Sequence, residues 1–346
     1  MFWDMARAFM GEFFINRKTR PVSTSFINMP QSSSFSFTHF SPNWWFRFPV
    51  QQMLVSRIIK TPAVNFEVHR IRFDDGTICR LDVAGSMQND KIIVLCPGLS
   101  GSYESPYCTH FAKAGIDAGY TVVVYTRRAH CADSISPTFP KHYDLADLQT
   151  VISWIDSASA SGSKTLYGVG VSCGGNAMIK YAGDMGDDCR FKRIVSVSNG
   201  FDINAVVNHC VCNNDELMDK VITNFTREIL QNVKGGGYDF GKKHSTFPAL
   251  EFKAIKTFND ETPYMTNYYD DMSCIHVFDK VNVPVLCINS LDDPLFHLEK
   301  ETYLKMTQDH PNISVILPSH GGHAGFVDVN CKCDWWCKNA VGFLTI

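Results

Sequence analysis

The sequence predicts an α/β protein with a mostly parallel sheet of eight strands, helices on both faces of the sheet, and an inserted helical cap. Three observations lead to this fold class. Apolar runs of strand length alternate with helix-like segments from residue 66 onward, and this alternation stops between residues 203 and 280. A glycine-rich turn, Gly170-Val171-Ser172-Cys173-Gly174, stands where a strand meets a helix. Regular alternation of this kind produces right-handed crossovers and parallel strands.

The composition is that of a globular protein. Of the 346 residues, 45% are hydrophobic and 19% are charged, so the chain can bury a large core. The net charge of −3 gives no basic field of the kind that nucleic-acid-binding proteins use, and no nucleic-acid partner is expected. The sequence has no run of 18 apolar residues, so a membrane-spanning helix is not expected.

The 13 cysteines are an odd number spread over strand-like and loop-like segments. The N-terminus lacks a secretory signal pattern, so we interpret most of them as reduced thiols of a protein that is not secreted. The expected location is intracellular, either cytoplasmic or peripherally associated with a membrane. An alternative is a zinc site formed by Cys331, Cys333 and Cys337, with Cys210 and Cys212 elsewhere in the chain. Their spacing differs from the usual zinc-site templates, so no metal is expected.

The chain is predicted to have an N-terminal arm, residues 1–43, followed by one domain over residues 44–346. Apolar side chains recur at spacings of three and four within residues 1–16, and basic residues follow. This pattern fits a short helix that contacts a membrane surface. It fits a packed or frayed terminus equally well. Residues 17–43, rich in Ser, Thr, Asn and Pro, are interpreted as a linker or loosely held arm.

The periodicity of apolar residues then places the elements of the domain. A tight hairpin at Asp74-Asp75-Gly76-Thr77 joins the first two strands, and nearly continuous apolar runs mark later strands as buried on both faces. The expected strands are residues 67–73, 78–83, 91–96, 120–126, 165–169, 193–197, 284–289 and 313–317. The expected helices between and after them are residues 107–118, 144–155, 176–182 and 335–344.

Residues 203–280 contain no apolar run of strand length. Leu217, Val221, Phe225 and Ile229 repeat instead at a spacing of four, as on one face of a helix, and three glycines at 235–237 end this pattern. We interpret the segment as a largely helical cap over the C-terminal edge of the sheet.

The turn at Ser172 has the form of a nucleophile elbow, a sharp strand-to-helix turn that exposes a serine. Such a turn brings backbone segments close together, and therefore needs the glycines found two residues before and two after the serine. The pentapeptide alone is also compatible with a structural glycine turn in any βα unit.

Ligand sites of open parallel sheets lie beyond the carboxyl ends of the strands, so segments directly after strands are candidates. Four segments share this position: residues 97–99, the turn at Ser172, residues 289–294 and residues 319–326. They supply a serine, an acidic pair and a histidine pair in that order along the chain. Serine, acid, histidine is the order of the α/β-hydrolase fold, and it differs from the orders in chymotrypsin and subtilisin.

Several stretches also carry a family resemblance: Pro97-Gly98-Leu99-Ser100-Gly101, Val171-Ser172-Cys173-Gly174-Gly175-Asn176, Phe258-Asn259-Asp260, Tyr268-Tyr269 with Ser273, Asp292-Asp293-Pro294, and Gly321-Gly322-His323-Ala324-Gly325-Phe326. Together they resemble the ABHD1/ABHD3 and bacterial YheT-like branch of the α/β hydrolases, which includes yeast medium-chain ester synthases/esterases. The resemblance covers about residues 42–346. It implies a serine hydrolase or acyltransferase that acts on acyl esters, often lipids, without a cofactor.

The sequence departs from this branch in two respects. Many relatives have a histidine where this chain has Pro97. This replacement leaves the backbone N–H donor of the following loop intact. Eukaryotic relatives commonly carry an N-terminal membrane anchor, and no such anchor is expected here, because the sequence shows no apolar run of 18 residues.

Catalytic roles follow from the order of the residues and from the resemblance. Ser172 is expected to be the nucleophile, His323 the base that takes its proton, and Asp293 the acid that orients the imidazole. Asp293 is preferred to Asp292 because it directly precedes Pro294, as in the family motif; Asp292 is expected to bind the loop instead. His323 is preferred to His320 because glycines bracket it.

The backbone N–H groups of Leu99 and Cys173 are expected to form the oxyanion hole. The Cys173 thiol itself is expected only to pack. Arg127-Arg128 follows a strand and is predicted to hold a loop near the mouth of the site. His110, His130 and His142 have no acidic motif beside them, and we interpret them as surface or satisfied core residues.

The leading hypothesis is hydrolysis of medium- to long-chain or lipid acyl esters through an acyl-enzyme on Ser172. Acyl transfer to an alcohol or lipid needs only a drier pocket and stays open as an alternative. The spacing of His323 and Asp328 matches an H-x4-D acyltransferase pattern, a further alternative. A catalytically silent scaffold used for binding is the third hypothesis, and the complete set of serine, acid and histidine in order argues against it.

Overall fold

The structure is a computed structural model that describes residues 22–31, 35–158, 164–212, 216–234, 246–259, 265–296, 298–308 and 310–346. The expected membrane-surface helix of residues 1–16, the glycines at 235–237 and Asp260 lie outside the described residues. Every helix among the described residues is too short or too polar to span a lipid bilayer.

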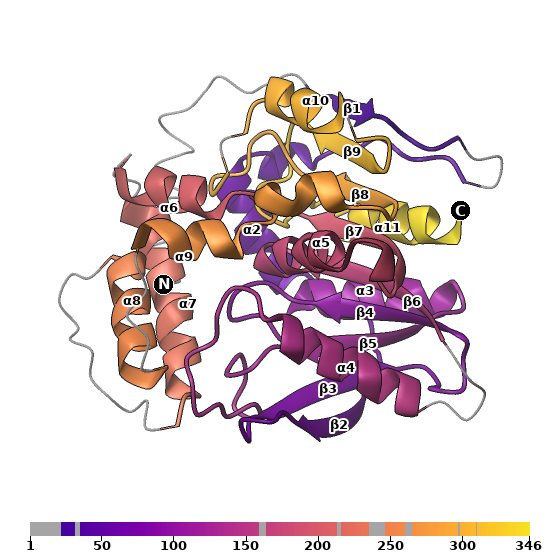
Figure 1. The fold of residues 1–346 in the computed structure, drawn as a ribbon. Coiled ribbons are helices and arrows are strands. Elements are labelled where there is room, and N and C mark those ends of the chain that lie inside the picture. Colours follow the sequence, from indigo (N-terminus) through magenta and orange to yellow (C-terminus); the bar gives the residue numbers. More distant parts are fainter. Residues whose placement is uncertain are drawn as a thin grey trace.

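The described strands form one nine-stranded sheet in the order β1-β9-β8-β7-β6-β4-β5-β3-β2 (Figure 1). From β5 across to β9 every neighbouring pair is parallel. Antiparallel pairs lie at the two margins, where β1 joins β9, β3 joins β5 and β2 joins β3. The predicted, mostly parallel sheet is confirmed, with one strand more than expected. The strands are β1 (Thr24–Ile27), β2 (Glu67–Arg72), β3 (Ile78–Ala84), β4 (Lys91–Cys96), β5 (Thr121–Thr126), β6 (Thr165–Val171), β7 (Phe191–Val197), β8 (Val285–Ile288) and β9 (Ile313–Pro318).

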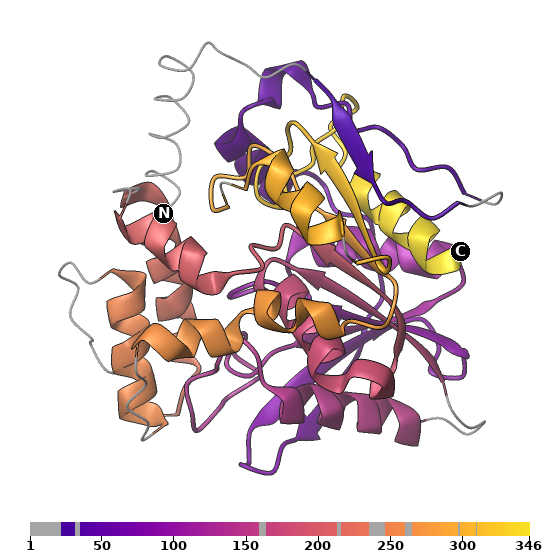
Figure 2. The ribbon, with the colours of Figure 1, turned by 45° about the horizontal axis from the view of Figure 1, so that its top comes forward.

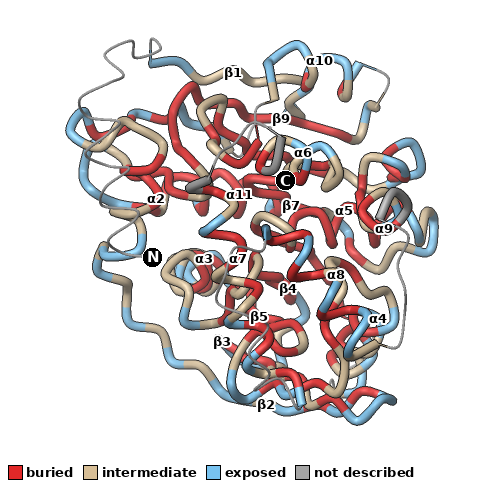
Figure 3. The backbone as a smooth tube through the Cα atoms, turned by 90° about the vertical axis from the view of Figure 1, so that its left-hand side faces the viewer, coloured by how far each residue is buried: buried red, intermediate tan, exposed pale blue. Residues whose placement is uncertain are grey.

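Helices cover both faces of the sheet (Figures 1 and 2). Helices α4 (Leu145–Ser157) and α5 (Cys173–Met185) pack in one core, and α3 (Pro106–Asp117) and α11 (Trp335–Thr345) pack in the other. Successive side chains of a strand point to opposite faces. In β4, for example, Val94 joins the first core and Ile93 and Leu95 join the second. The strands therefore run through the buried centre of the molecule (Figure 3), which explains their continuous apolar sequences.

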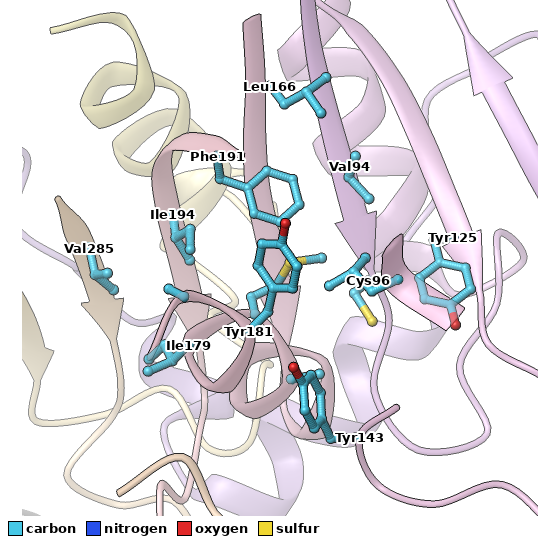
Figure 4. Close-up of a cluster of buried hydrophobic side chains, with 14 of the residues drawn as sticks. Val94, Cys96, Tyr125, Tyr143, Leu166, Ile179, Tyr181, Phe191, Ile194 and Val285 are labelled. Atoms are coloured by element: carbon cyan, nitrogen blue, oxygen red, sulfur yellow. The ribbon is translucent and has the colours of Figure 1, made fainter. Parts of the chain in front are cut away.

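The first core fixes the helix that begins at the Ser172 turn. Tyr181 of α5 and Phe191 of β7 are both buried and meet edge to face, with ring centroids 5.3 Å apart. Ile179 and Ile194 of the same two elements belong to this cluster (Figure 4). Because α5 is held by these contacts, its N-terminus has one position relative to the sheet.

Four helices follow β7 before the sheet resumes at β8: α6 (Ile203–Cys212), α7 (Glu216–Gln231), α8 (Phe247–Phe258) and α9 (Met265–Met272). They lie together at one end of the sheet (Figure 1) and have a hydrophobic core of their own, which includes Met218, Ile229 and Leu250. Leu295 and Phe296, which follow β8, pack into the same core and join this helical group to the sheet. The remaining short elements are η1 (Trp44–Phe46), α2 (Pro49–Ile58), η2 (Gly186–Asp188), η3 (Cys274–Lys280) and α10 (Lys300–Gln308).

Residues 22–43 differ from the predicted linker, and in the described part of this segment that interpretation is wrong. Strand β1 pairs with β9, and the Asn28 side chain donates a 2.7 Å hydrogen bond to the carbonyl of Ile313. Phe40 is 2% exposed and contacts the rings of Phe326 and Trp335. The polar composition did not reveal this, because edge pairing uses backbone groups and a few apolar side chains, Phe40 among them, pack against the core.

Candidate active site

Ser172 lies at the turn between β6 and α5, with φ 57° and ψ −125°, a conformation that L-residues rarely adopt. The flanking glycines are sterically required. A Cβ on Gly170 would lie 2.2 Å from the carbonyl oxygen of Gly174, and a Cβ on Gly174 would lie 2.1 Å from the carbonyl oxygen of Cys96. The Ser172 N–H donates a 2.8 Å hydrogen bond to the carbonyl of Val197. The turn therefore has the tight geometry that a nucleophile elbow needs.

Ser172, His323 and Asp293 form a continuous chain of hydrogen bonds. His323 Nε2 lies 2.9 Å from Ser172 Oγ, and His323 Nδ1 lies 2.8 Å from Asp293 Oδ2. The Asp293 side chain is 1% exposed, and its other oxygen accepts a hydrogen bond from the Leu295 N–H at 2.9 Å. The Phe296 ring packs edge to face on the imidazole, with centroids 5.0 Å apart. This environment orients the imidazole so that Nε2 faces the serine hydroxyl.

The two neighbouring candidates make other contacts. Asp292 Oδ1 accepts a 2.9 Å hydrogen bond from the N–H of Gly322 and so shapes the histidine loop. His320 is buried, and its Nδ1 lies 2.9 Å from Ser319 Oγ. Of the two candidate pairs, the structure brings Asp293 and His323 to Ser172.

Leu99 and Cys173, the expected oxyanion-hole residues, line the same cavity as Ser172. Cys173 is the first residue of α5, where a backbone N–H has no acceptor within its own helix. The loop after β4 approaches the elbow closely, since a Cβ on Gly98 would lie 3.2 Å from Ser172 Cβ. Both N–H groups therefore belong to segments that meet at Ser172.

A cavity of about 430 Å³ lies against Ser172 and His323. Its walls come from α2, from the loops after the strands and from the helical group, and they are largely apolar. Apolar lining residues are Met53, Leu99, Val171, Phe201, Ile203, Val206, Val207, Val221, Ile222, Phe225, Phe247, Leu295, Phe296 and Ala324. A cavity with these walls accepts an apolar chain while a polar group at its end faces the serine.

A group of charged residues beside the elbow was not predicted as a unit. Arg127 is 6% exposed, and its Nη2 donates to Cys173 Sγ at 2.8 Å and to the Gly98 carbonyl at 3.3 Å. Its Nη1 donates to the carbonyl of His142 at 3.0 Å. His142 Nε2 in turn lies 2.9 Å from Glu251 Oε1 on α8. Arg127 thus holds the loop after β4, as predicted, and the ion pair of His142 links the sheet to the helical group.

These charges shift the pKa values of two groups. Burial lowers the pKa of His142, but the Glu251 carboxylate and Cys173 outweigh this effect and raise it to about 10. Burial raises the pKa of the Cys173 thiol, but Arg127 and His142 outweigh burial and hold it below its ordinary value. The Cys173 thiol therefore does more than pack, because it accepts a hydrogen bond from Arg127, and the pairing of His142 with Glu251 agrees with its interpretation as a satisfied core residue. The only sequence signal for this group of charged residues was the position of Arg127 directly after a strand.

Asp328 and the cysteines near the C-terminus, two alternatives from the sequence, lie apart from the chain of hydrogen bonds at Ser172. Asp328 Oδ1 accepts hydrogen bonds from the N–H groups of Asn330 and Lys332 and closes a turn, so it is engaged away from His323. None of the twelve cysteines whose side chains are described forms a disulfide, and Cys331 is exposed while Cys333 and Cys337 are buried. Within the described part of the chain, no three His, Cys, Asp or Glu side chains cluster closely enough to hold a metal ion.

A serine, a histidine and an aspartate joined by hydrogen bonds, each in a loop that follows a strand of one parallel sheet, define the α/β hydrolases. The family model described as the alpha/beta hydrolase fold matches residues 91–328, and the chain belongs to this family.

Individual relatives agree with this assignment. Phospholipase ABHD3 of Bos taurus is 26% identical over 312 residues, which cover 84% of this chain and 74% of that protein. Monoacylglycerol lipase ABHD2 of Danio rerio is 25% identical over 264 residues, which cover 70% of this chain and 61% of that protein. Among solved structures, the esterase Pf2001 of Pyrococcus furiosus superposes with a TM-score of 0.57 at 14% identity, over 90% of this chain and 98% of that one. The name ABHD3 appears in the branch that the sequence motifs resemble, ABHD2 is another protein named as an ABHD-type hydrolase, and the third match is a similarity of fold.

Proposed function

We propose that the protein is a serine hydrolase that cleaves acyl esters of medium or long chain length, including lipid esters, through an acyl-enzyme on Ser172. The observation that carries the proposal is the hydrogen-bonded chain from Asp293 through His323 to Ser172 at the wall of an apolar cavity. Relatives named as a phospholipase and a monoacylglycerol lipase support the same reaction class.

Acylation would begin with attack of Ser172 Oγ on the ester carbonyl while His323 Nε2 takes up the serine proton. The buried Asp293 carboxylate would stabilise the imidazolium that forms. The N–H groups of Leu99 and Cys173 would bind the developing oxyanion, an interaction worth about 3 kcal/mol per donor. His323 would then protonate the leaving alcohol, and the same groups in reverse order would let water release the acid.

The acyl chain would lie against the apolar wall that α7 contributes to the cavity. Burial of each methylene stabilises a complex by about 0.8 kcal/mol, so a longer chain binds more tightly until the cavity is filled. The polar residues Arg57, Ser100, Glu104 and Glu228 also line the cavity, where they can contact the alcohol part of the ester. We therefore expect medium or long acyl esters to be preferred over acetate esters.

A fluorophosphonate probe tests the proposal, because it labels only an activated serine. We expect wild-type protein to be labelled, Ser172→Ala to lose the label, and Ser102→Ala, a change of another serine that lines the cavity, to keep it. Labelling that survives Ser172→Ala would contradict the proposal.

Ester hydrolysis itself is measured with nitrophenyl esters of increasing chain length. An added alcohol separates hydrolysis from acyl transfer, since a transferase would form a new ester in place of the free acid. Residues 1–16 carry a further part of the proposal: their apolar spacing supports contact with a membrane surface, which would bring the enzyme to lipid substrates.

A further inference from the structure

We propose that Cys173 is a modification site: its thiolate reacts with peroxide, and the sulfenic acid that forms switches off hydrolysis at Ser172. The effect on activity rests on the proposed function. The thiol chemistry does not, because it depends only on Cys173 and the charges around it.

Cys173 belongs to a cluster of charged side chains drawn from separate parts of the fold. Arg127 Nη2 lies 2.8 Å from Sγ, and the positive charge of His142 also favours the thiolate. Glu251 lies 2.9 Å from His142 and favours its charged form, and Glu251 is itself held by a 2.9 Å hydrogen bond from Tyr269 Oη. Two cationic groups at a sulfur stabilise the thiolate, which is the nucleophilic form of cysteine.

Cys173 borders the substrate cavity. Cys173 is only partly buried, and it lines the cavity of about 430 Å³ together with Ser172 and His142. A small oxidant that enters this cavity comes next to Cys173. Cys131 offers a comparison, because it is also partly buried and lies in the loop after β5, but burial raises the pKa of its thiol. Cys131 is therefore a partly buried cysteine whose surroundings do not favour the thiolate.

The reaction is an ordinary two-electron oxidation. The thiolate sulfur attacks one oxygen of hydrogen peroxide, and an S–O bond forms as the O–O bond breaks. Sulfur is oxidised, peroxide is reduced, and the hydroxide that leaves takes a proton from the His142 imidazolium to become water. The sulfenic acid is reversible, since a thiol reductant restores the cysteine.

The geometry explains why this change would stop hydrolysis. Arg127 already lies at contact distance from the sulfur, so an added oxygen atom displaces the guanidinium. The same guanidinium holds the carbonyl of Gly98, the residue before Leu99. Its displacement disturbs the backbone on both sides of the proposed oxyanion hole, at Leu99 and at Cys173. Loss of one oxyanion donor costs about 100-fold or more in kcat.

The first test measures hydrolysis of a soluble short-chain ester before and after hydrogen peroxide, with each protein compared with its own untreated activity. We expect wild type and Cys131→Ser to lose activity about 100-fold and to regain it with dithiothreitol. We expect Cys173→Ala to lose less than about twofold under the same treatment. Equal inactivation of Cys173→Ala and wild type would overturn the proposal.

The second test does not need hydrolysis. A dimedone probe traps sulfenic acid, and peptide mass spectrometry locates it in wild type and in Ser172→Ala. We expect the label on Cys173 and not on Cys131 in both proteins, and labelling about tenfold slower in His142→Gln. A Cys173 that stays unlabelled would overturn the proposal. The ester-hydrolysing activity of the untreated protein tests the proposed hydrolase function separately.

Discussion

Asp293 and its neighbour Asp292 differ in what each carboxylate binds. Asp293 Oδ2 lies 2.8 Å from His323 Nδ1, whereas Asp292 Oδ1 accepts the backbone N–H of Gly322 at 2.9 Å. We therefore expect Asp293→Asn to lower kcat by about 10⁴, because an amide cannot hold the imidazole in the same tautomer. Asp292→Asn should lower kcat by less than about tenfold, since it weakens the hydrogen bond from the Gly322 N–H and leaves the contact between Asp293 and the imidazole intact. Steady-state kinetics on a soluble ester measure both, and circular dichroism checks that each protein is folded.

His323 and His320 form a second matched pair at the same scale. His323→Ala should be as damaging as Asp293→Asn, and the double variant should be little worse than either, because residues that act as one unit are not additive. His320→Ala should retain most of the activity if it folds. If Asp292→Asn or His320→Ala proves the more damaging member of its pair, the roles assigned within that loop are wrong.

At the scale of elements, α7 is the helix from which Val221, Ile222 and Phe225 reach the cavity. Val221 is 3% exposed, so Val221→Trp would fill space that a long acyl chain needs. We expect KM for a dodecanoyl ester to rise about tenfold, the equivalent of roughly two buried methylenes, while KM for a butanoyl ester changes little. Gln231→Trp, at the exposed end of the same helix, is the control. Equal effects on both esters would show that α7 does not set the chain length.

The segment before α2 gives a prediction about stability. Phe40 is 2% exposed between the rings of Phe326 and Trp335, whereas Trp44 is 62% exposed. We expect Phe40→Ala to lower the free energy of unfolding by about 3 kcal/mol. Trp44→Ala should change it by less than about 0.5 kcal/mol. Urea unfolding compares them, and a Phe40→Ala protein as stable as wild type would restore the linker interpretation of this segment.

At the scale of the whole molecule, the site exists because parallel strands end at one edge of the sheet. The loops after β4, β6, β8 and β9 meet there, although Ser172 and His323 are 151 residues apart in the chain. The helical group covers this edge and contributes much of the apolar wall.

Membrane contact is also a property of the whole molecule. If residues 1–16 bind a lipid surface, their deletion should move the protein from vesicle-bound to free fractions in a flotation assay. Activity on a soluble short-chain ester should stay unchanged, because the cavity and the residues around Ser172 are intact. An unchanged partition between the two fractions would contradict this part of the proposal.

The sequence alone determined those features that depend on neighbouring residues. Continuous apolar runs such as residues 91–96 predicted central strands, because both faces of each strand had to be covered. The glycines at 170 and 174 predicted the tight turn, because any side chain there would collide with backbone. The order of serine, acid and histidine predicted which loops would meet.

Only the tertiary structure decided the features that depend on how distant segments dock. Strand β1 pairs with β9 through backbone groups nearly 300 residues apart, which composition does not record. The turn after β8 decided which of two adjacent carboxylates reaches His323. The cluster of charged side chains joins two loops, the elbow and α8, through Arg127, His142, Cys173 and Glu251. The interacting residues are too far apart in the chain for a short sequence motif to show that they pair. Steric limits between neighbouring residues can be inferred from the sequence, whereas contacts between distant segments form only when the elements pack.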